Sequence, residues 1–150
     1  MTSPTTQLLH FSQRFRKYCA GQFTPLLAEA DLTMREVQVL LFLANNPGCD
    51  TARDIVELRG LAKSQVSQAV ELLVSRGLLR RVADGADRRV VHLALTETGA
   101  PLAARSQAIQ AGCARRLLEA LTPEESEQFN RLLGKVFAGA EQLMEKERSK

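Results

Sequence analysis

The sequence has no run of apolar residues long enough to cross a lipid bilayer, and its first residues, MTSPTTQ, lack the charged and apolar regions of a signal peptide. These absences predict a cytoplasmic protein that does not act at a membrane. Cysteine and histidine are scarce, and Cys19, Cys49 and Cys113 lack the spacing of metal ligands. His10 and His92 stand isolated in the sequence, without companion ligands. We therefore expect no metal or other cofactor, and free thiols in a reducing cytosol.

Catalytic patterns are missing as well. The chain shows no nucleophile beside a base, no glycine-rich loop for a phosphate and no paired carboxylates in a meaningful context. An enzyme is therefore not expected. The charge balance, with 20 lysines and arginines against 17 acidic residues, permits nucleic-acid binding without requiring it. The 150 residues, 45% of them hydrophobic, suffice for one domain with helical extensions.

The segment 63–76 organises the rest of the chain. Its apolar residues recur at the spacing of a helix that lies on a core, and they are Val66, Ala69, Val70 and Leu73. The opposite face near the start carries hydrogen-bonding side chains, none of them acidic, that suit the base edges in a groove: Lys63, Ser64, Gln65, Ser67 and Gln68. Taken alone, these polar residues fit a solvated face equally well.

A predicted hairpin follows this helix. Gly77 can adopt the left-handed conformation that ends a helix, and residues 78–82 and 90–95 have the pattern of two strands. Two arginines, Arg88 and Arg89, lie near the tip of the hairpin. A polar-faced helix followed by such a hairpin is the arrangement of a winged helix-turn-helix. There, the helix enters a major groove and the hairpin reaches an adjacent minor groove.

Two helix starts precede the polar-faced helix. Thr33 and Glu36 have the spacing of a capping box, and Thr51 with Asp54 repeats that pattern for a short second helix. Residues 59–62, which include a glycine, then form the turn before the polar-faced helix. Two helices of this size joined by such a turn match the helix-turn-helix signature.

The hairpin and the residues after it resemble a known family. The sequence DRR at 87–89, a strand, and LTETG at 95–99 are similar to the wing and the following helix start of MarR-type transcriptional regulators. The order of the remaining elements extends the resemblance over nearly the whole chain. It implies a regulator that binds double-stranded DNA, most often as a repressor. It also implies control by a small molecule, often a phenolic or other aromatic acid, held between the dimerisation helices and the DNA-binding lobe.

Roles on the predicted recognition helix stay divided between two kinds of contact. Gln65 and Gln68 could each pair with an adenine, which would specify sequence. Lys63, Ser64 and Ser67 are better suited to phosphates, which would position the protein without specifying sequence.

For the wing, the resemblance suggests that Asp87 braces the loop while Arg89 enters the minor groove, with Arg88 as the competing candidate. Arginine suits this place because a narrow minor groove has an enhanced negative potential. Further phosphate contacts are expected from Arg53, Arg76, Arg80 and Arg81.

The terminal regions carry helical apolar patterns that need a partner surface. In the first region, Gly21 and Pro25 predict a kink or break. Near the end, a helix predicted for residues 96–120 is followed by TPEE at 122–125, a strong helix restart. The expected partner is a second copy of the chain, in a two-fold dimer.

We therefore predict a mainly α fold with a small β-hairpin wing. Residues 1–32 form an N-terminal dimerisation helix, 33–99 the winged helix-turn-helix lobe, and 100–150 the C-terminal dimerisation helices, in one intertwined domain. A homodimer would read a pseudopalindromic operator with half-sites roughly 10 bp apart or a multiple of that.

An effector cleft, if present, could draw polar contacts from Arg14, Tyr18 and Arg35. Two other functions stay open. The first is a redox-switched regulator that uses Cys19 or Cys49, in which the basic residues just before Cys19 would lower the pKa of its thiol. A buried or incidental free thiol is the favoured interpretation of Cys19. The second is a winged-helix module that binds protein rather than DNA, which the modest net charge would suit.

Overall fold

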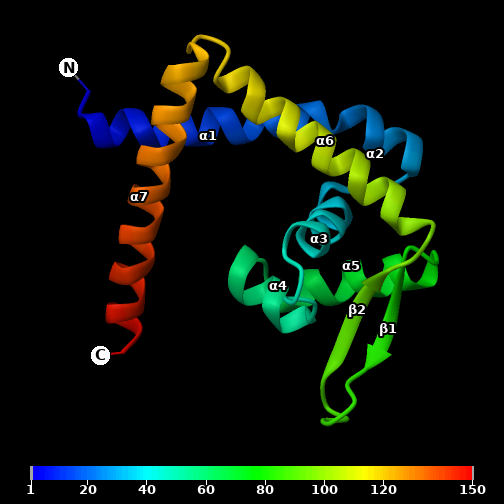
Figure 1. The fold of residues 1–150 in the computed structure, drawn as a ribbon. Helices are drawn as coiled ribbons and strands as arrows, with labels where there is room; N and C mark the ends of the chain where they lie inside the picture. The colour runs from blue at the N-terminus through cyan, green and yellow to red at the C-terminus, as the bar shows by residue number, and fades with distance from the viewer. Residues whose placement is uncertain (1, 150) are drawn as a thin grey trace. The chain divides into compact units, whose positions relative to one another are not determined.

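The computed structural model describes residues 2–149 (Figure 1). In chain order the elements are α1 (Pro4–Gln22), α2 (Thr24–Ala30), α3 (Met34–Asn45), α4 (Ala52–Arg59), α5 (Lys63–Ser75), β1 (Leu79–Ala83), β2 (Val91–Leu95), α6 (Gly99–Leu117) and α7 (Pro123–Arg148). The chain divides into two compact units, residues 1–113 and 114–150. Within residues 2–149, no helix is both long and apolar enough to cross a membrane.

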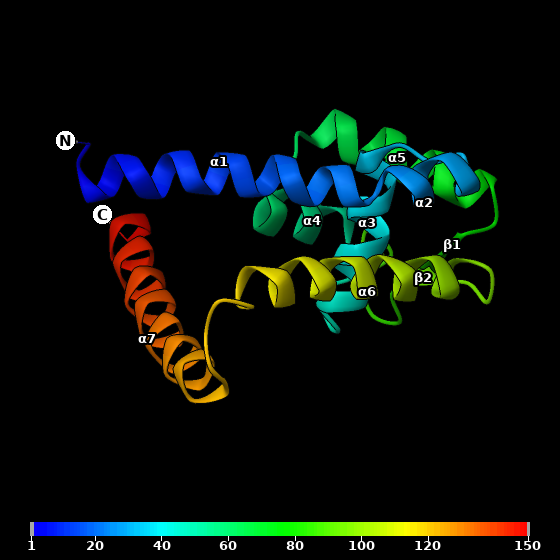
Figure 2. The same ribbon diagram turned by 90° about the horizontal axis from the view of Figure 1, so that it is seen from above.

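The break predicted near Gly21 and Pro25 is confirmed. α1 ends at Gln22, and α2 starts one residue later with Pro25 in its first turn. Figure 2 shows α2 following directly on α1. Phe23 at the junction and Leu26 in α2 are buried, so the break directs apolar side chains into the core of the first unit.

Side-chain caps determine where α3 and α4 of the helix-turn-helix begin. The Thr33 hydroxyl accepts the N–H of Glu36 while the Glu36 carboxylate accepts the N–H of Thr33, and Thr51 with Asp54 repeats this exchange at α4. α4 ends at Gly60, whose φ of 71° lies in the left-handed region that glycine tolerates best. Both predicted capping boxes are thus confirmed, and together with the glycine turn they place α4 before α5.

The core of the first unit lies between the helix-turn-helix, the hairpin and α6. Its fully buried side chains include Val37, Val39 and Leu40 of α3, Ile55 of α4 and Leu73 of α5. All four apolar positions predicted for α5 are buried, so the helix packs on this core through the expected stripe. Each large aliphatic side chain buried in this way contributes roughly 1.5–3 kcal/mol.

The hairpin follows α5 as predicted, with each strand starting one residue later than the pattern indicates. Gly77 has a φ of 70°, and β1 pairs antiparallel with β2 so that Leu79 faces Leu95 and Val82 faces His92. The sequence predicts strand starts at residues 78 and 90, whereas the paired strands begin at Leu79 and Val91. Leu78 stays outside the ladder because it donates its N–H back to the carbonyl of Leu73. Within the hairpin, the loop between β1 and β2 is the part that lies farthest from α6 (Figure 1).

Thr96 joins the hairpin to α6. Its hydroxyl accepts the N–H of Gly99 at 3.0 Å and donates to the carbonyl of Gly77 at 2.6 Å, so one side chain caps α6 and fixes the root of the hairpin. α6 ends at Leu117, short of the predicted end at Ala120, because the chain turns before Thr122 caps α7. In the second unit, the Thr122–Glu125 capping box and Pro123 start α7 as expected.

Candidate nucleic-acid interface

α5 presents a polar face beside the hairpin. Lys63, Ser64, Ser67 and Gln68 are exposed, and Gln65 is half-buried. Ala62, the residue before the helix, makes no side-chain cap, so the first N–H groups of α5 point outward without a capping side chain. A helix N-terminus of this kind favours an anion such as a phosphate. All five predicted recognition residues therefore share one end of one helix.

The hairpin loop is built around two aspartates. One Asp84 oxygen accepts the backbone N–H groups of Ala86 and Asp87, at 2.9 and 2.8 Å. Asp87 in turn accepts the backbone N–H of Arg89 at 2.9 Å and lies 3.2 Å from its guanidinium, which lowers the pKa of the Asp87 carboxyl. The Arg89 side chain is still 91% exposed. Asp87 thus contacts both the backbone N–H and the guanidinium of an arginine that stays exposed to solvent, and Arg88 beside it is exposed too.

His92 lies near the loop end of β2, and it has two side-chain partners that its isolated place in the sequence does not indicate. Its Nδ1 lies 2.6 Å from the carboxylate of Asp50, and its Nε2 lies 2.8 Å from that of Asp84. The hydrogen bonds to these two side chains raise the pKa of His92. The His92 contact and two backbone N–H groups hold the pKa of Asp84 at about 2. Asp50 precedes α4, so the pair of bonds links the hairpin to the helix-turn-helix.

Backbone contacts reinforce this link. Thr51 forms an antiparallel bridge with His92, and the N–H of Leu93 donates to the carbonyl of Asp50 at 2.7 Å. The residues just before α4 are therefore bonded to β2 through an isolated bridge beside the two-stranded hairpin. Asp50 lies 42 residues before His92, and no local motif indicates that contact, whereas Asp84 belongs to the same hairpin.

Three of the four arginines predicted at phosphates make contacts within the chain. Arg53 pairs with Glu57 at 2.8 Å, and Arg81 pairs with Glu71 at 2.7 Å. Arg76 donates to the carbonyls of Ala30 and Asp31, both at 2.6 Å, so it joins the end of α5 to the end of α2. Arg80, on the first strand, is exposed.

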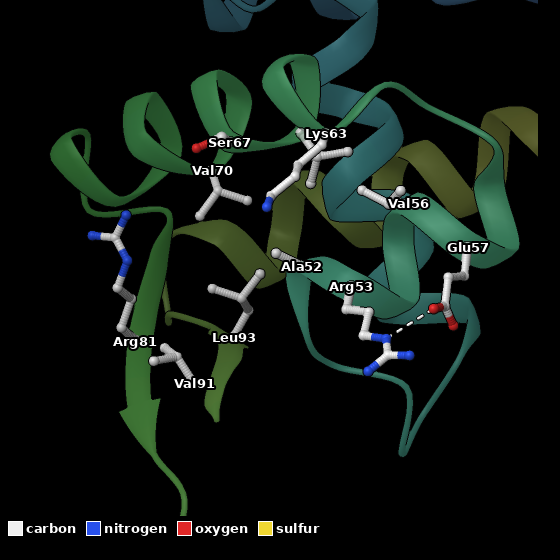
Figure 3. A pocket seen from close by; sticks show the side chains of 11 residues that line it. Ala52, Arg53, Val56, Glu57, Lys63, Ser67, Val70, Arg81, Val91 and Leu93 are labelled. Atoms are coloured by element: carbon white, nitrogen blue, oxygen red, sulfur yellow. Dashed lines mark hydrogen bonds and ion pairs between the residues drawn. The ribbon is translucent and has the colours of Figure 1, made fainter. Parts of the chain in front are cut away.

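A pocket of about 450 Å³ lies between α4, α5 and the hairpin (Figure 3). Figure 3 shows Val70 and Leu93 facing each other across it, with the Lys63 amine above and the guanidinium groups of Arg53 and Arg81 at its sides. The complete lining is Ala52, Arg53, Val56, Glu57, Lys63, Val66, Ser67, Val70, Arg81, Val91 and Leu93. The pocket is therefore apolar inside, and most of the charged side chains at its edge are cations.

The residues predicted for an effector cleft lie on two helices. Arg14 is exposed on α1 and lines a hollow of about 300 Å³ with Thr2, Gln7, His10 and Phe11. Tyr18, on the same helix, stacks on Phe15 with ring centroids 6.4 Å apart. Arg35 is exposed near the start of α3. The lining of the hollow includes neither Tyr18 nor Arg35.

The thiol of Cys19 does not have the lowered pKa that the redox alternative requires. Burial and the neighbouring side chain of Cys113 raise the pKa of Cys19 to about 11, so the suggested lowering by nearby basic residues is wrong. Arg16 and Lys17 are exposed, and their charges remain in water, where they are screened. Cys49 is half-buried, and Cys113 is buried.

Both units expose large apolar side chains. On α1 of the first unit, Leu8 and Leu9 are 65% and 59% exposed. In the second unit no α7 residue is buried, and its exposed large apolar side chains are Phe129, Leu132, Val136, Phe137, Leu143 and Met144. Apolar surface gathered along a helix in this way marks a contact with another chain or surface.

The chain is similar in sequence to a family of known proteins. The MarR family profile matches residues 30–90, which span the helix-turn-helix, β1 and the hairpin loop. The transcriptional regulator HosA of Escherichia coli O127:H6 is 29% identical over 106 residues, covering 71% of this chain and 78% of HosA. These relatives are transcriptional regulators and not enzymes.

Among the solved structures with the same fold, two concern proteins that bind DNA. BpsR of Bordetella bronchiseptica, whose DNA binding is regulated by 6-hydroxynicotinic acid, is 26% identical, with a TM-score of 0.64 over 87% of this chain and 98% of that one. MepR of S. aureus, solved in complex with DNA, is 21% identical, with a TM-score of 0.67 over 93% of this chain and 99% of that one. At that identity the likeness to MepR shows the fold alone.

Proposed function

We propose that this chain, which belongs to the MarR family of transcriptional regulators, acts in the cytoplasm as a homodimeric repressor of transcription. The dimer binds a pseudopalindromic duplex through α5 and the hairpin of each protomer. A small aromatic acid releases it from the DNA.

One observation carries the DNA-binding part of the proposal. The N-terminal turn of α5, with its exposed polar side chains, stands beside a hairpin whose loop carries the exposed Arg88 and Arg89. In a winged helix, these two parts reach the major groove and the adjacent minor groove of one duplex. Gln65 and Gln68 are proposed to contact bases, and Lys63, Ser64 and Ser67 to contact phosphates. Arg53, Arg80 and Arg81 are proposed to add phosphate contacts, while Arg76 is proposed mainly to join α5 to α2.

The dimer follows from the exposed apolar surface of the terminal helices. Large side chains such as Phe137 and Leu143, 58% and 67% exposed, are unfavourable in water and would be covered by a second copy. Residues 1–32 and 100–150 are proposed as the dimerisation segments around the lobe of residues 33–99. Sedimentation should show a dimer for the natural sequence and for Gln142→Asp, and a weakened dimer for Phe137→Asp. An unchanged dimer in Phe137→Asp would remove α7 from the interface.

Release by a ligand is supported by the likeness to BpsR, whose DNA binding responds to an aromatic acid. A ligand lowers DNA affinity only by preferring a dimer geometry that fits DNA poorly, so the two bindings must oppose each other. Arg14, Tyr18 and Arg35 are the proposed polar contacts. A suitable first probe is 6-hydroxynicotinic acid, added to the protein–DNA complex with the neutral amide of the same acid as control. Release by the acid alone is expected, and equal effects of the two compounds would contradict an anion-specific site.

The DNA-binding proposal is tested by selection of duplexes from a random pool, followed by titration of the bound complex against salt. We expect a pseudopalindromic motif, and an affinity that falls steeply with salt because phosphate contacts release counterions. Failure to enrich any sequence, with binding that does not depend on salt, would overturn the proposal and favour a protein partner.

A further inference from the structure

Three segments of the first unit meet at one imidazole ring. His92 on β2 contacts Asp50, which precedes α4, and Asp84, which belongs to the hairpin loop. Asp54 at the start of α4 accepts hydrogen bonds from the backbone and side chain of Thr51, which lower the pKa of its carboxyl, and the charges of Arg53 and His92 contribute less. The neighbour across the hairpin is Val82 of β1, which carries no charge. Two carboxylates, those of Asp50 and Asp84, therefore contact one titratable ring.

We propose that His92 is a proton-dependent latch of the wing, which holds the hairpin on the helix-turn-helix when the ring is protonated. A protonated imidazole has two N–H donors and can serve Asp50 and Asp84 together, whereas a neutral ring has only one. Deprotonation therefore leaves one of the two short contacts, 2.6 and 2.8 Å, without its hydrogen bond. The inference rests on the proposed DNA-binding function, because the position of the wing matters for affinity only if the wing contacts DNA.

The latch connects directly to the loop that carries the wing arginine. Asp84 contacts His92 with one oxygen, and with the other it accepts the N–H groups of Ala86 and Asp87. Asp87 then holds Arg89. A change at the ring is therefore transmitted through one aspartate to the backbone of the loop, and His92 acts as a positioning residue rather than as a DNA contact.

Charge acts in the same direction as geometry. Loss of the proton removes one positive charge from a lobe that is proposed to face phosphates. The attraction between the lobe and the phosphates becomes weaker, which lowers the affinity for DNA. Because Asp50 and Asp84 raise the pKa of His92, the protonated form persists to a higher pH than for an ordinary histidine near 6.5. Operator affinity should therefore be highest at mildly acidic pH and decrease as the pH rises through the pKa of His92.

The chain offers a matched control, because its two histidines are His10 and His92. Affinity for the selected duplex should be measured by fluorescence anisotropy between pH 6 and 9 at constant ionic strength. The natural sequence and His10→Gln should lose affinity roughly 2- to 10-fold as the pH rises, the scale of a single net hydrogen bond. His92→Gln should show little pH dependence.

A second variant separates titration from a merely structural role. Asp50→Asn keeps an oxygen acceptor but removes one carboxylate charge, so the midpoint of the pH profile should move to lower pH. A structural role alone would weaken binding in both variants and leave the pH profile unchanged, and that result would overturn the latch.

Proton NMR of the imidazole groups tests the latch without DNA. The resonance of His92 should titrate above the value of about 6.5 that an ordinary histidine has, and a midpoint at or below that value would overturn the proposal. Binding of DNA by every variant with one common pH profile would refute the latch alone. Failure of all variants to bind any duplex would refute the proposed function, and the role of the latch in it.

Discussion

Gly99 starts α6 where its backbone lies directly against the residue before β1. A Cβ atom at this position would overlap the carbonyl oxygen of Leu78 and lie 2.9 Å from its carbonyl carbon. That carbonyl also accepts the N–H of Thr96, so it cannot move without disturbing the root of the hairpin. Overpacking costs typically 1–3 kcal/mol, and the obstacle here is backbone rather than a side chain that can rotate. Gly99→Ala should therefore lower the free energy of unfolding by about 3 kcal/mol.

The same substitution at Gly134 provides the control. This residue lies within α7, away from the apolar side of the helix, and a Cβ there would meet nothing within 4 Å. Alanine should stabilise α7 by roughly 0.5–1 kcal/mol, because it loses less conformational freedom than glycine. Thermal unfolding at one fixed protein concentration compares the two variants. Gly99→Ala should lower Tm by roughly 6–12 °C, from 2–4 °C per kcal/mol for a chain of this size, while Gly134→Ala raises it. An unchanged Tm in Gly99→Ala would refute the close approach of α6 to Leu78.

Three further results are expected. Arg89→Ala should weaken operator binding by roughly 1–3 kcal/mol in a gel-shift titration, whereas Arg131→Ala on α7 should leave it unchanged; equal losses would remove the wing from the mechanism. Thr51→Ala should reduce the free energy of unfolding by about 1 kcal/mol through loss of the α4 cap, and Thr51→Ser should restore most of it in urea unfolding. The raised pKa of His92 stabilises the fold fully below its unfolded pKa of about 6.5 and less as the pH rises through the folded pKa, so the Tm advantage over His92→Gln should shrink toward pH 9; an advantage that grew would contradict the sign.

Local rules predicted the elements of this fold well. A capping box needs only residues three apart, so the starts of α3, α4 and α7 could be read directly from Thr33, Thr51 and Thr122. A left-handed turn needs one glycine, and Gly77 marks the end of the α5 region correctly. The end of α6 was less predictable, because no single residue there competes strongly with the helix.

Contacts between distant residues could not be predicted in the same way. His92 lies far along the chain from Asp50, and only the bridge between Thr51 and His92 brings them together. Cys19 had basic neighbours in sequence, but its pKa responds to burial and to Cys113 on another helix. Sequence patterns show which face of a helix is buried, whereas the partner on the opposite side depends on how the elements pack.

For the recognition residues, the sequence predicts where they lie but not which contacts they make. Their helix, its buried stripe and its exposed polar start follow from periodicity, and the structure shows each of them. The contacts that they make depend on a duplex, so the division between base and phosphate contacts remains a prediction.

The polar face of α5 is the centre of this account, and single-base variants of the selected duplex test it most directly. Affinities should be compared for the natural sequence, for the double variant Gln65→Ala/Gln68→Ala, and for Gln142→Ala on α7 as the control. The natural sequence and the control should each lose roughly 1–3 kcal/mol per substituted base that a glutamine contacts. The double variant should lose this discrimination at symmetric positions of both half-sites, while its affinity for unrelated duplexes stays the same. If the double variant ranked the substituted duplexes as the natural sequence does, α5 would not read the bases, and the central claim would be wrong.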